Sequence, residues 1–156
     1  MSHLRNFIVT ISLLFFINID VKSQEVTEAH KDSIRKIVER YYSLNLKVYQ
    51  QNSTKDDIDN LFNLFTDDFV YVHPKYGGEY SRKDIYEGYI NNQKNGSFNG
   101  STVDVKIENM IIGLNALVTD RVYLRKVESS ELEEVDPGMS LFEFRNGKIS
   151  KIFEYW

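Results

Sequence analysis

The spacing of apolar residues along this chain changes once, near Ser101, and this change limits the fold more than any other feature of the sequence. Before Ser101, apolar side chains recur every three or four residues, as on one face of a helix. After it they alternate with polar ones, as in a strand with one buried face. Helices followed by a run of strands are typical of the α+β class. The sequence therefore predicts three N-terminal helices packed on one face of a curved, mostly antiparallel sheet.

Three helical segments are predicted before the change. The first lies within residues 27–51, where apolar and aromatic side chains share one face. A shorter helix follows the polar residues 52–54. A third begins after Ser81, a good N-cap residue, with Asp84 completing a capping box, and is expected to end near Lys94. The apolar face of the second helix is expected to consist of Ile58, Leu61, Phe62 and Phe65.

Strands are predicted at residues 69–73, 103–108 and 115–125, followed by a hairpin at the C-terminus. Two alternating segments flank Asn146-Gly147, and an Asn-Gly pair in that position is the strongest short-range signal for a β-hairpin. The sheet is therefore expected to have at least four strands.

The strand at residues 115–125 has two different faces, because successive side chains of a strand point in opposite directions. The set expected to face the helices is Leu117, Thr119, Arg121 and Tyr123. The opposite set is apolar apart from Asp120 and consists of Ala116, Val118, Val122 and Leu124. A sheet that helices cover on one side and that is still apolar on the other predicts a homodimer formed through the outer sheet face.

The first 23 residues have the layout of a secretory signal peptide. A basic stretch with Arg5 precedes the apolar residues 7–17, and small residues for cleavage lie at 21–23. The apolar run is short for a membrane span, and an uncleaved N-terminal anchor is the alternative. Residues 24–156 are then expected to form one domain, secreted or periplasmic, with no membrane contact after the signal is removed. The absence of cysteine fits export without disulfide bonds.

Composition and motifs exclude several classes of function. The formal net charge is −4, whereas nucleic-acid binding needs concentrated lysine and arginine. The sequence contains no cluster of histidine, cysteine and carboxylate residues with metal-ligand spacing. It also lacks a glycine-rich phosphate loop and a nucleophile elbow. We therefore expect neither nucleic acid as a partner nor a metal or other cofactor.

Strand alternation gathers ionisable and aromatic side chains on the inner face of the sheet. A histidine exchanges protons near neutral pH, and an arginine beside a glutamate keeps the carboxylate ionised. His73, Glu154 and Arg121 are thus candidate catalytic residues for acid/base chemistry on a small, apolar, oxygenated molecule. Two alternatives remain: Arg121 and Glu154 neutralise each other as a cross-strand ion pair, or His73 only forms a structural hydrogen bond. The full set on this face is Tyr71, His73, Thr119, Arg121, Tyr123, Ser140, Glu154 and Trp156.

Four short segments resemble the SnoaL-like branch of the NTF2-like superfamily. They are residues 64–69 (LFTDDF), 71–74 (YVHP), 80–84 (YSRKD) and 154–156 (EYW). This superfamily has a cone-shaped α+β fold and includes ketosteroid isomerases, polyketide cyclases and limonene-type epoxide hydrolases. The resemblance covers the chain after the signal peptide, and it implies a conical pocket between helices and sheet.

Compared residue by residue, this chain lacks some of the catalytic residues of the epoxide hydrolases and the ketosteroid isomerases that it resembles. Residues 119–123 (TDRVY) are similar to the Thr-Glu-Arg-Val-Asp strand of the epoxide hydrolases, so Arg121 is retained and Glu154 replaces one catalytic aspartate. Tyr123 replaces the other, which removes half of the acid/base pair. By similarity to the isomerases, Tyr41 takes the place of the oxyanion-hole tyrosine. Their two aspartates correspond to His73 and Ser140, so steroid isomerisation is not expected.

The sequence thus predicts an exported protein that binds a small hydrophobic molecule in a conical pocket, with His73, Glu154 and Arg121 in catalytic roles. The alternative is a non-catalytic ligand-binding or protein-interaction domain of the same fold. The residues expected to contact the ligand are Tyr41, Tyr71, Tyr123, Ser140 and Trp156.

Overall fold

A computed structural model describes residues 26–127 and 131–155 of the chain. The predicted signal peptide, residues 1–23, and the predicted ligand contact Trp156 lie outside the described residues. The helices and strands occur in the order α1 (Glu28–Val48), α2 (Lys55–Phe62), β1 (Phe65–His73), a short 3-10 helix (Pro74–Tyr76), β2 (Gly78–Ser81), α3 (Arg82–Lys94), β3 (Thr102–Ile112), β4 (Ala116–Lys126), β5 (Leu132–Arg145) and β6 (Lys148–Tyr155).

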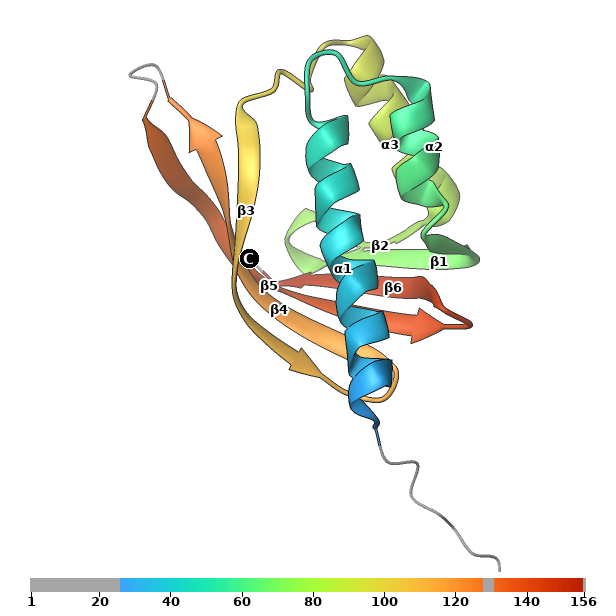
Figure 1. Cartoon of the computed structure of the whole chain (residues 1–156). Helices are drawn as coiled ribbons and strands as arrows, with labels where there is room; N and C mark the ends of the chain where they lie inside the picture. Colours follow the sequence, from blue (N-terminus) through green and yellow to red (C-terminus); the bar gives the residue numbers. More distant parts are fainter. Residues whose placement is uncertain (1–25, 128–130, 156) are drawn as a thin grey trace, which may run out of the picture.

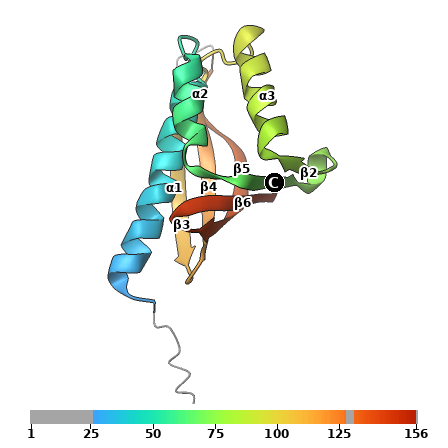
Figure 2. The same cartoon turned by 90° about the vertical axis from the view of Figure 1, so that its right-hand side faces the viewer.

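Three helices lie on the concave side of one curved sheet, as the sequence predicts (Figure 1). The strand order is β2-β1-β6-β5-β4-β3, and only β1 and β6 pair in parallel. The view in Figure 2 shows α1 and α2 on one side and α3 on the other, with the sheet below and between them. The α+β prediction is therefore confirmed, with six strands in a mixed, mostly antiparallel sheet.

Side-chain caps begin the helices at the expected places. Oγ of Ser81 accepts a hydrogen bond from the backbone N–H of Asp84 at 3.2 Å, and the carboxylate of Asp84 accepts from N–H of Ser81 at 2.9 Å. Thr54 and Asp57 form the same reciprocal box at the start of α2. Each box satisfies backbone donors that a helix leaves unpaired in its first turn. The predicted N-cap at Ser81 is confirmed.

The second helix is shorter than its apolar spacing predicts. It ends at Phe62, and Phe65 is the first residue of β1, with its ring stacked on that of Phe69 at a centroid distance of 4.1 Å. Assigning Phe65 to the helix was wrong, because periodicity alone does not separate a short helix from the buried strand that follows it. The backbone N–H of Ile149 donates to the carbonyl of Leu64 at 2.9 Å, which ties this junction to β6.

The Asn-Gly turn determines which residues of β5 and β6 face each other. Asn146 and Gly147 have φ angles of 53° and 73°. Both lie in the left-handed region that a tight two-residue hairpin turn requires. The predicted hairpin is therefore confirmed, and its register places Ser140 directly opposite Glu154. A slip of β6 by one residue would turn the side chain of Glu154 to the outer face and separate it from Ser140.

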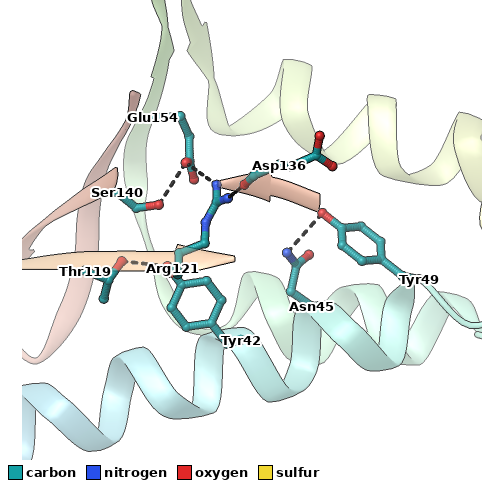
Figure 3. A network of polar contacts seen from close by, with 8 residues as sticks. All are labelled: Tyr42, Asn45, Tyr49, Thr119, Arg121, Asp136, Ser140 and Glu154. Atoms are coloured by element: carbon teal, nitrogen blue, oxygen red, sulfur yellow. Dashed lines mark hydrogen bonds and ion pairs between the residues drawn. The ribbon is translucent and has the colours of Figure 1, made fainter. Parts of the chain in front are cut away.

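The helices pack on the sheet through an aromatic core. The ring of Tyr41, on α1, lies 5.2 Å from that of Phe142, on β5, in an edge-to-face arrangement. The hydroxyl of Tyr42 shares a hydrogen bond of 2.8 Å with Oγ1 of Thr119, on β4 (Figure 3). All four side chains are buried. These contacts hold α1 against the middle of the sheet.

The outer face of the sheet carries a continuous apolar row. Register pairs connect Ile111 to Val118, Val118 to Leu141 and Leu141 to Phe153, across β3, β4, β5 and β6. Ile111 is 66% exposed. No helix of the described residues is both long and apolar enough to span a membrane. The homodimer expected through this face stays a prediction.

Candidate functional site

A buried ion pair and a serine hydroxyl connect three strands on the face that the helices cover. Nη2 of Arg121, on β4, donates to Oε2 of Glu154, on β6, at 2.9 Å. Oγ of Ser140, on β5, donates to the same carboxylate oxygen at 2.8 Å (Figure 3). The exposed fractions are 2% for Arg121, 5% for Glu154 and 0% for Ser140. The carboxylate charge is thus compensated by a cation and a hydroxyl.

A bulge in β5 supplies a further acceptor for the guanidinium. In the pairing of β4 with β5, Arg121 lies opposite Gly138, and the register shifts before Tyr123. Asp136 lies within this shift and has a φ of 51°, a left-handed conformation that is uncommon outside glycine. Its carbonyl oxygen accepts from Nη1 of Arg121 at 2.5 Å. The bulge therefore turns a backbone carbonyl toward a buried cation.

The surroundings of Arg121 keep it charged. Burial lowers the pKa of Arg121, but Tyr123 and Glu154 raise it, and the net result is a pKa above the ordinary value. The guanidinium carbon lies 4.6 Å from the ring centroid of Tyr123. Nε of Arg121 is buried and has no hydrogen-bond partner in the described part of the chain. A buried donor without a partner is uncommon in native proteins.

The ion pair borders a cavity of about 400 Å³ between the helices and the sheet, which we call the inner cavity. Arg121, Glu154 and Asp84 are its charged wall residues. Most of the remaining wall is aromatic. The aromatic wall residues are Tyr41, Tyr49, Tyr71, Tyr80, Tyr89, Tyr123, Phe65, Phe69 and Phe98.

Four tyrosines of this wall remain neutral hydroxyls. Burial raises the pKa values of Tyr41, Tyr89 and Tyr123 well above the usual value. Burial likewise raises the pKa of Tyr71. Near pH 7 these side chains therefore offer hydrogen bonds to a ligand without adding charge to the cavity.

A hydrogen-bonded chain at the end of α1 belongs to the same wall and is absent from the residues expected from the sequence. The hydroxyl of Tyr89 donates to Oδ1 of Asn45 at 2.8 Å, and Nδ2 of Asn45 donates to the hydroxyl of Tyr49 at 3.1 Å. Asn45 is 1% exposed. Its position among the apolar residues of one helical face is a signal that was available, because a buried amide must find partners.

The structure brings most of the predicted site residues to one place. Tyr41, Tyr71 and Tyr123 line the inner cavity together with Arg121 and Glu154. Ser140 is fully buried, and its hydroxyl contacts the carboxylate of Glu154. The arrangement places a buried charge pair at an aromatic cavity, as strand alternation indicates.

His73 lies on the same face but is not among the residues that line the inner cavity in the described chain. β1 and β6 are parallel, and Val72 pairs with Phe153, so the register places His73 alongside Glu154. The imidazole is 2% exposed and lies 4.3 Å from the ring of Tyr76. Burial lowers the pKa of His73, and the neighbouring positive charges add to that effect. The imidazole is therefore neutral near pH 7.

The described residues contain no group of three histidine, cysteine or carboxylate side chains placed to hold a metal ion. No family model and no curated protein matches the sequence.

Solved structures match the chain over most of its length. An NTF2-like protein from Anabaena variabilis is 12% identical, with a TM-score of 0.56 over 84% of this chain and 94% of its own. The chain has the NTF2-like fold. A putative SnoaL-like polyketide cyclase from Shewanella putrefaciens is 13% identical, with a TM-score of 0.55 over 77% of each chain. A protein with a ketosteroid isomerase-like fold from Catenulispora acidiphila, in complex with trimethylamine, is 17% identical, with a TM-score of 0.52 over 78% of this chain and 85% of its own.

These structural similarities establish the fold and leave the activity open. They confirm the NTF2-like resemblance that the sequence motifs indicate. Within this fold, the inner cavity and the Arg121–Glu154 pair are the features from which a function must be argued.

Removing one member of the buried pair is expected to cost more stability than removing both. Glu154→Gln leaves the guanidinium without its counter-charge, and we expect the free energy of unfolding to fall by about 3 kcal/mol. The double variant Arg121→Met with Glu154→Leu is expected to lose less, because no buried charge remains. Urea denaturation at neutral pH measures both. Glu108→Gln, which removes an exposed ion pair with Lys106, is the matched control and is expected to have a much smaller effect. A double variant less stable than Glu154→Gln would contradict this account.

The lowered pKa of His73 makes a separate prediction about pH. The unfolded chain takes up a proton near the ordinary histidine value of 6.5, whereas the folded protein takes it up only at lower pH. Acidification below about pH 6.5 therefore favours the unfolded chain, and stability rises again as pH returns to neutral. We expect the wild type to lose more stability than His73→Gln between pH 7.5 and pH 5.5, measured by urea denaturation. Parallel losses in the two proteins would show that His73 titrates normally.

Proposed function

We propose that this protein binds a small, mainly apolar molecule in the inner cavity, with an oxygen atom of that molecule facing the Arg121–Glu154 pair. The observation that carries the proposal is a buried ion pair in the wall of a largely aromatic cavity of about 400 Å³. Small-molecule sites typically span about 300–1,000 Å³, with apolar walls and a few polar groups that orient the ligand.

The wall provides both parts of such a site. Aromatic rings supply the apolar area that drives binding of an uncharged body. Nε of Arg121 is a buried donor that a ligand oxygen is able to satisfy, and the Asn45–Tyr49 chain adds hydroxyl and amide groups. A ligand with a carbonyl or hydroxyl group uses these groups, whereas a pure hydrocarbon leaves them unsatisfied.

Proteins of this fold support the proposal. The Catenulispora acidiphila protein was solved with a small organic molecule, trimethylamine, and the Shewanella putrefaciens protein is described as a putative polyketide cyclase. For this chain the likeness supports a small-molecule site, and the ligand class rests on the wall residues described above.

The proposal extends to acid/base catalysis on the bound molecule. Glu154 lines the cavity and His73, neutral near pH 7, lies on the adjacent strand of the same face. Arg121 then holds the carboxylate and stabilises an oxyanion on the substrate. The alternative, a non-catalytic binding domain, is favoured by one observation: Arg121 and Ser140 already donate to Glu154.

Export and self-association complete the proposal. The apolar run before residue 24 supports a secreted or periplasmic location. The apolar row from Ile111 to Phe153 supports pairing of two copies through the outer sheet face.

A larger side chain in the wall of the inner cavity is expected to weaken binding without harming the fold. Gly88, on α3, lines the inner cavity, and a Cβ added there meets nothing within 4 Å. Glycine inside a helix is also less stable than other residues by up to about 1 kcal/mol. We expect Gly88→Leu to keep or raise stability and to weaken binding of β-tetralone and β-naphthol by at least about tenfold in isothermal titration calorimetry. Glu87→Leu, exposed on the same helix, is the matched control and is expected to bind normally. Equal affinities in the two variants would place the ligand elsewhere.

The proposed acid/base catalysis is tested with an aromatic ketone, whose ring matches the aromatic wall and whose carbonyl activates the neighbouring protons. We expect the wild type to accelerate hydrogen–deuterium exchange next to the carbonyl of β-tetralone by about 10²-fold or more over buffer, measured by NMR. Glu154→Gln, shown to be folded at the assay temperature, is expected to lose most of this acceleration, because Glu154 is the carboxylate that lines the cavity beside the ligand. Binding of β-tetralone by the wild type without accelerated exchange would favour the non-catalytic alternative.

A further inference from the structure

A second cavity adjoins the inner one, and we call it the outer cavity. Its volume is about 640 Å³, and its wall is formed by the end of α1, the connection between α3 and β3, and residues of β4 and β5. Tyr49, Phe98, Arg121 and Tyr123 line both cavities. These four residues therefore form a wall that the two spaces share.

Arg121 is the charged member of that shared wall. Its guanidinium lies between Glu154 on one side and the backbone of Asp136 on the other (Figure 3). Glu154 borders the inner cavity, and Asp136 borders the outer one. A bound molecule that extends from one cavity to the other must therefore pass the guanidinium and its buried Nε donor.

The charges of the two cavities differ in sign. The charged residues of the inner wall are Arg121, Asp84 and Glu154, an excess of negative charge. Those of the outer wall are Arg121, Arg125 and Asp136, an excess of positive charge. An elongated molecule with one anionic end is thus favoured in a single orientation, with that end in the outer cavity.

Arg125 is able to meet an anion at this position. Its Nη2 donates to the carboxylate of Asp136 at 3.1 Å, but both side chains are 42% exposed. Ion pairs exposed to that extent contribute little, because water and salt screen them. A carboxylate on a ligand whose body is already bound competes with Asp136 for the guanidinium, and planar bidentate geometry favours that contact.

We propose that the ligand is an amphipathic carboxylate, with its apolar body in the inner cavity and its carboxylate in the outer cavity against Arg125 and Arg121. This inference rests on the proposed function, because it requires the inner cavity to hold the apolar body. It adds the chemical class of the ligand and its direction.

The test compares two probes that differ only at the polar end, ω-phenylhexanoate and ω-phenylhexanol, by isothermal titration calorimetry at about pH 7.5, where the acid is ionised. We expect the wild type to bind the carboxylate about tenfold more tightly than the alcohol. Arg125→Gln is expected to reduce that preference to about twofold or less, because it weakens binding of the carboxylate far more than binding of the alcohol. Lys126→Gln removes the same charge from the next residue of β4, which is exposed and not in the outer wall, and is expected to keep the preference.

A second measurement does not depend on any variant. Raising the salt concentration from about 0.05 M to about 0.5 M is expected to weaken binding of the carboxylate several-fold and leave the alcohol unaffected. Equal affinities for the two probes, or a preference that survives Arg125→Gln, would overturn the carboxylate inference and leave the proposed function intact. Failure of both probes to bind, or binding of both that Gly88→Leu does not weaken, would overturn the proposed function itself.

Discussion

The buried pair of Arg121 and Glu154 is the interaction on which the rest of the site depends. Removing two charges from water costs several kcal/mol per ion, and apolar residues of similar size are often at least as stable. The fold therefore needs further partners for the pair, and the hydroxyl of Ser140 and the carbonyl of Asp136 provide them. Stability alone therefore does not account for such a pair in a cavity wall, and we relate it to the proposed ligand binding.

The geometry of the pair is produced by register and by one irregularity. The tight turn at Asn146-Gly147 sets β5 against β6 so that Ser140 faces Glu154. The parallel pairing of β1 with β6 brings His73 to the same edge of the site. The bulge at Asp136 then aligns a carbonyl with the guanidinium and leaves the Asp136 side chain beside Arg125. The bulge thus contacts Arg121, which lines both the inner and the outer cavity.

Strand alternation predicted the central side chains of the site. Arg121, Ser140 and Glu154 were assigned to the inner face from period-two spacing, and they meet there. The cap at Ser81 was equally readable, because a capping box spans only four residues. Asn45 and Tyr49 were not predicted, because their role depends on Tyr89 from a different helix. Phe65 was misplaced, since its neighbours in β6 are distant in sequence.

The sequence by itself determined the α+β class, the helix starts, the C-terminal hairpin and the inner face for Arg121, Ser140 and Glu154. These features depend on interactions between residues a few positions apart, so their signals are local. Only the tertiary structure decided the depth of the inner cavity, the bulge at Asp136 and the position of Arg121 between two cavities. Those features arise from packing between segments far apart in the chain, where small differences in register and side-chain volume decide whether a space is filled or left open.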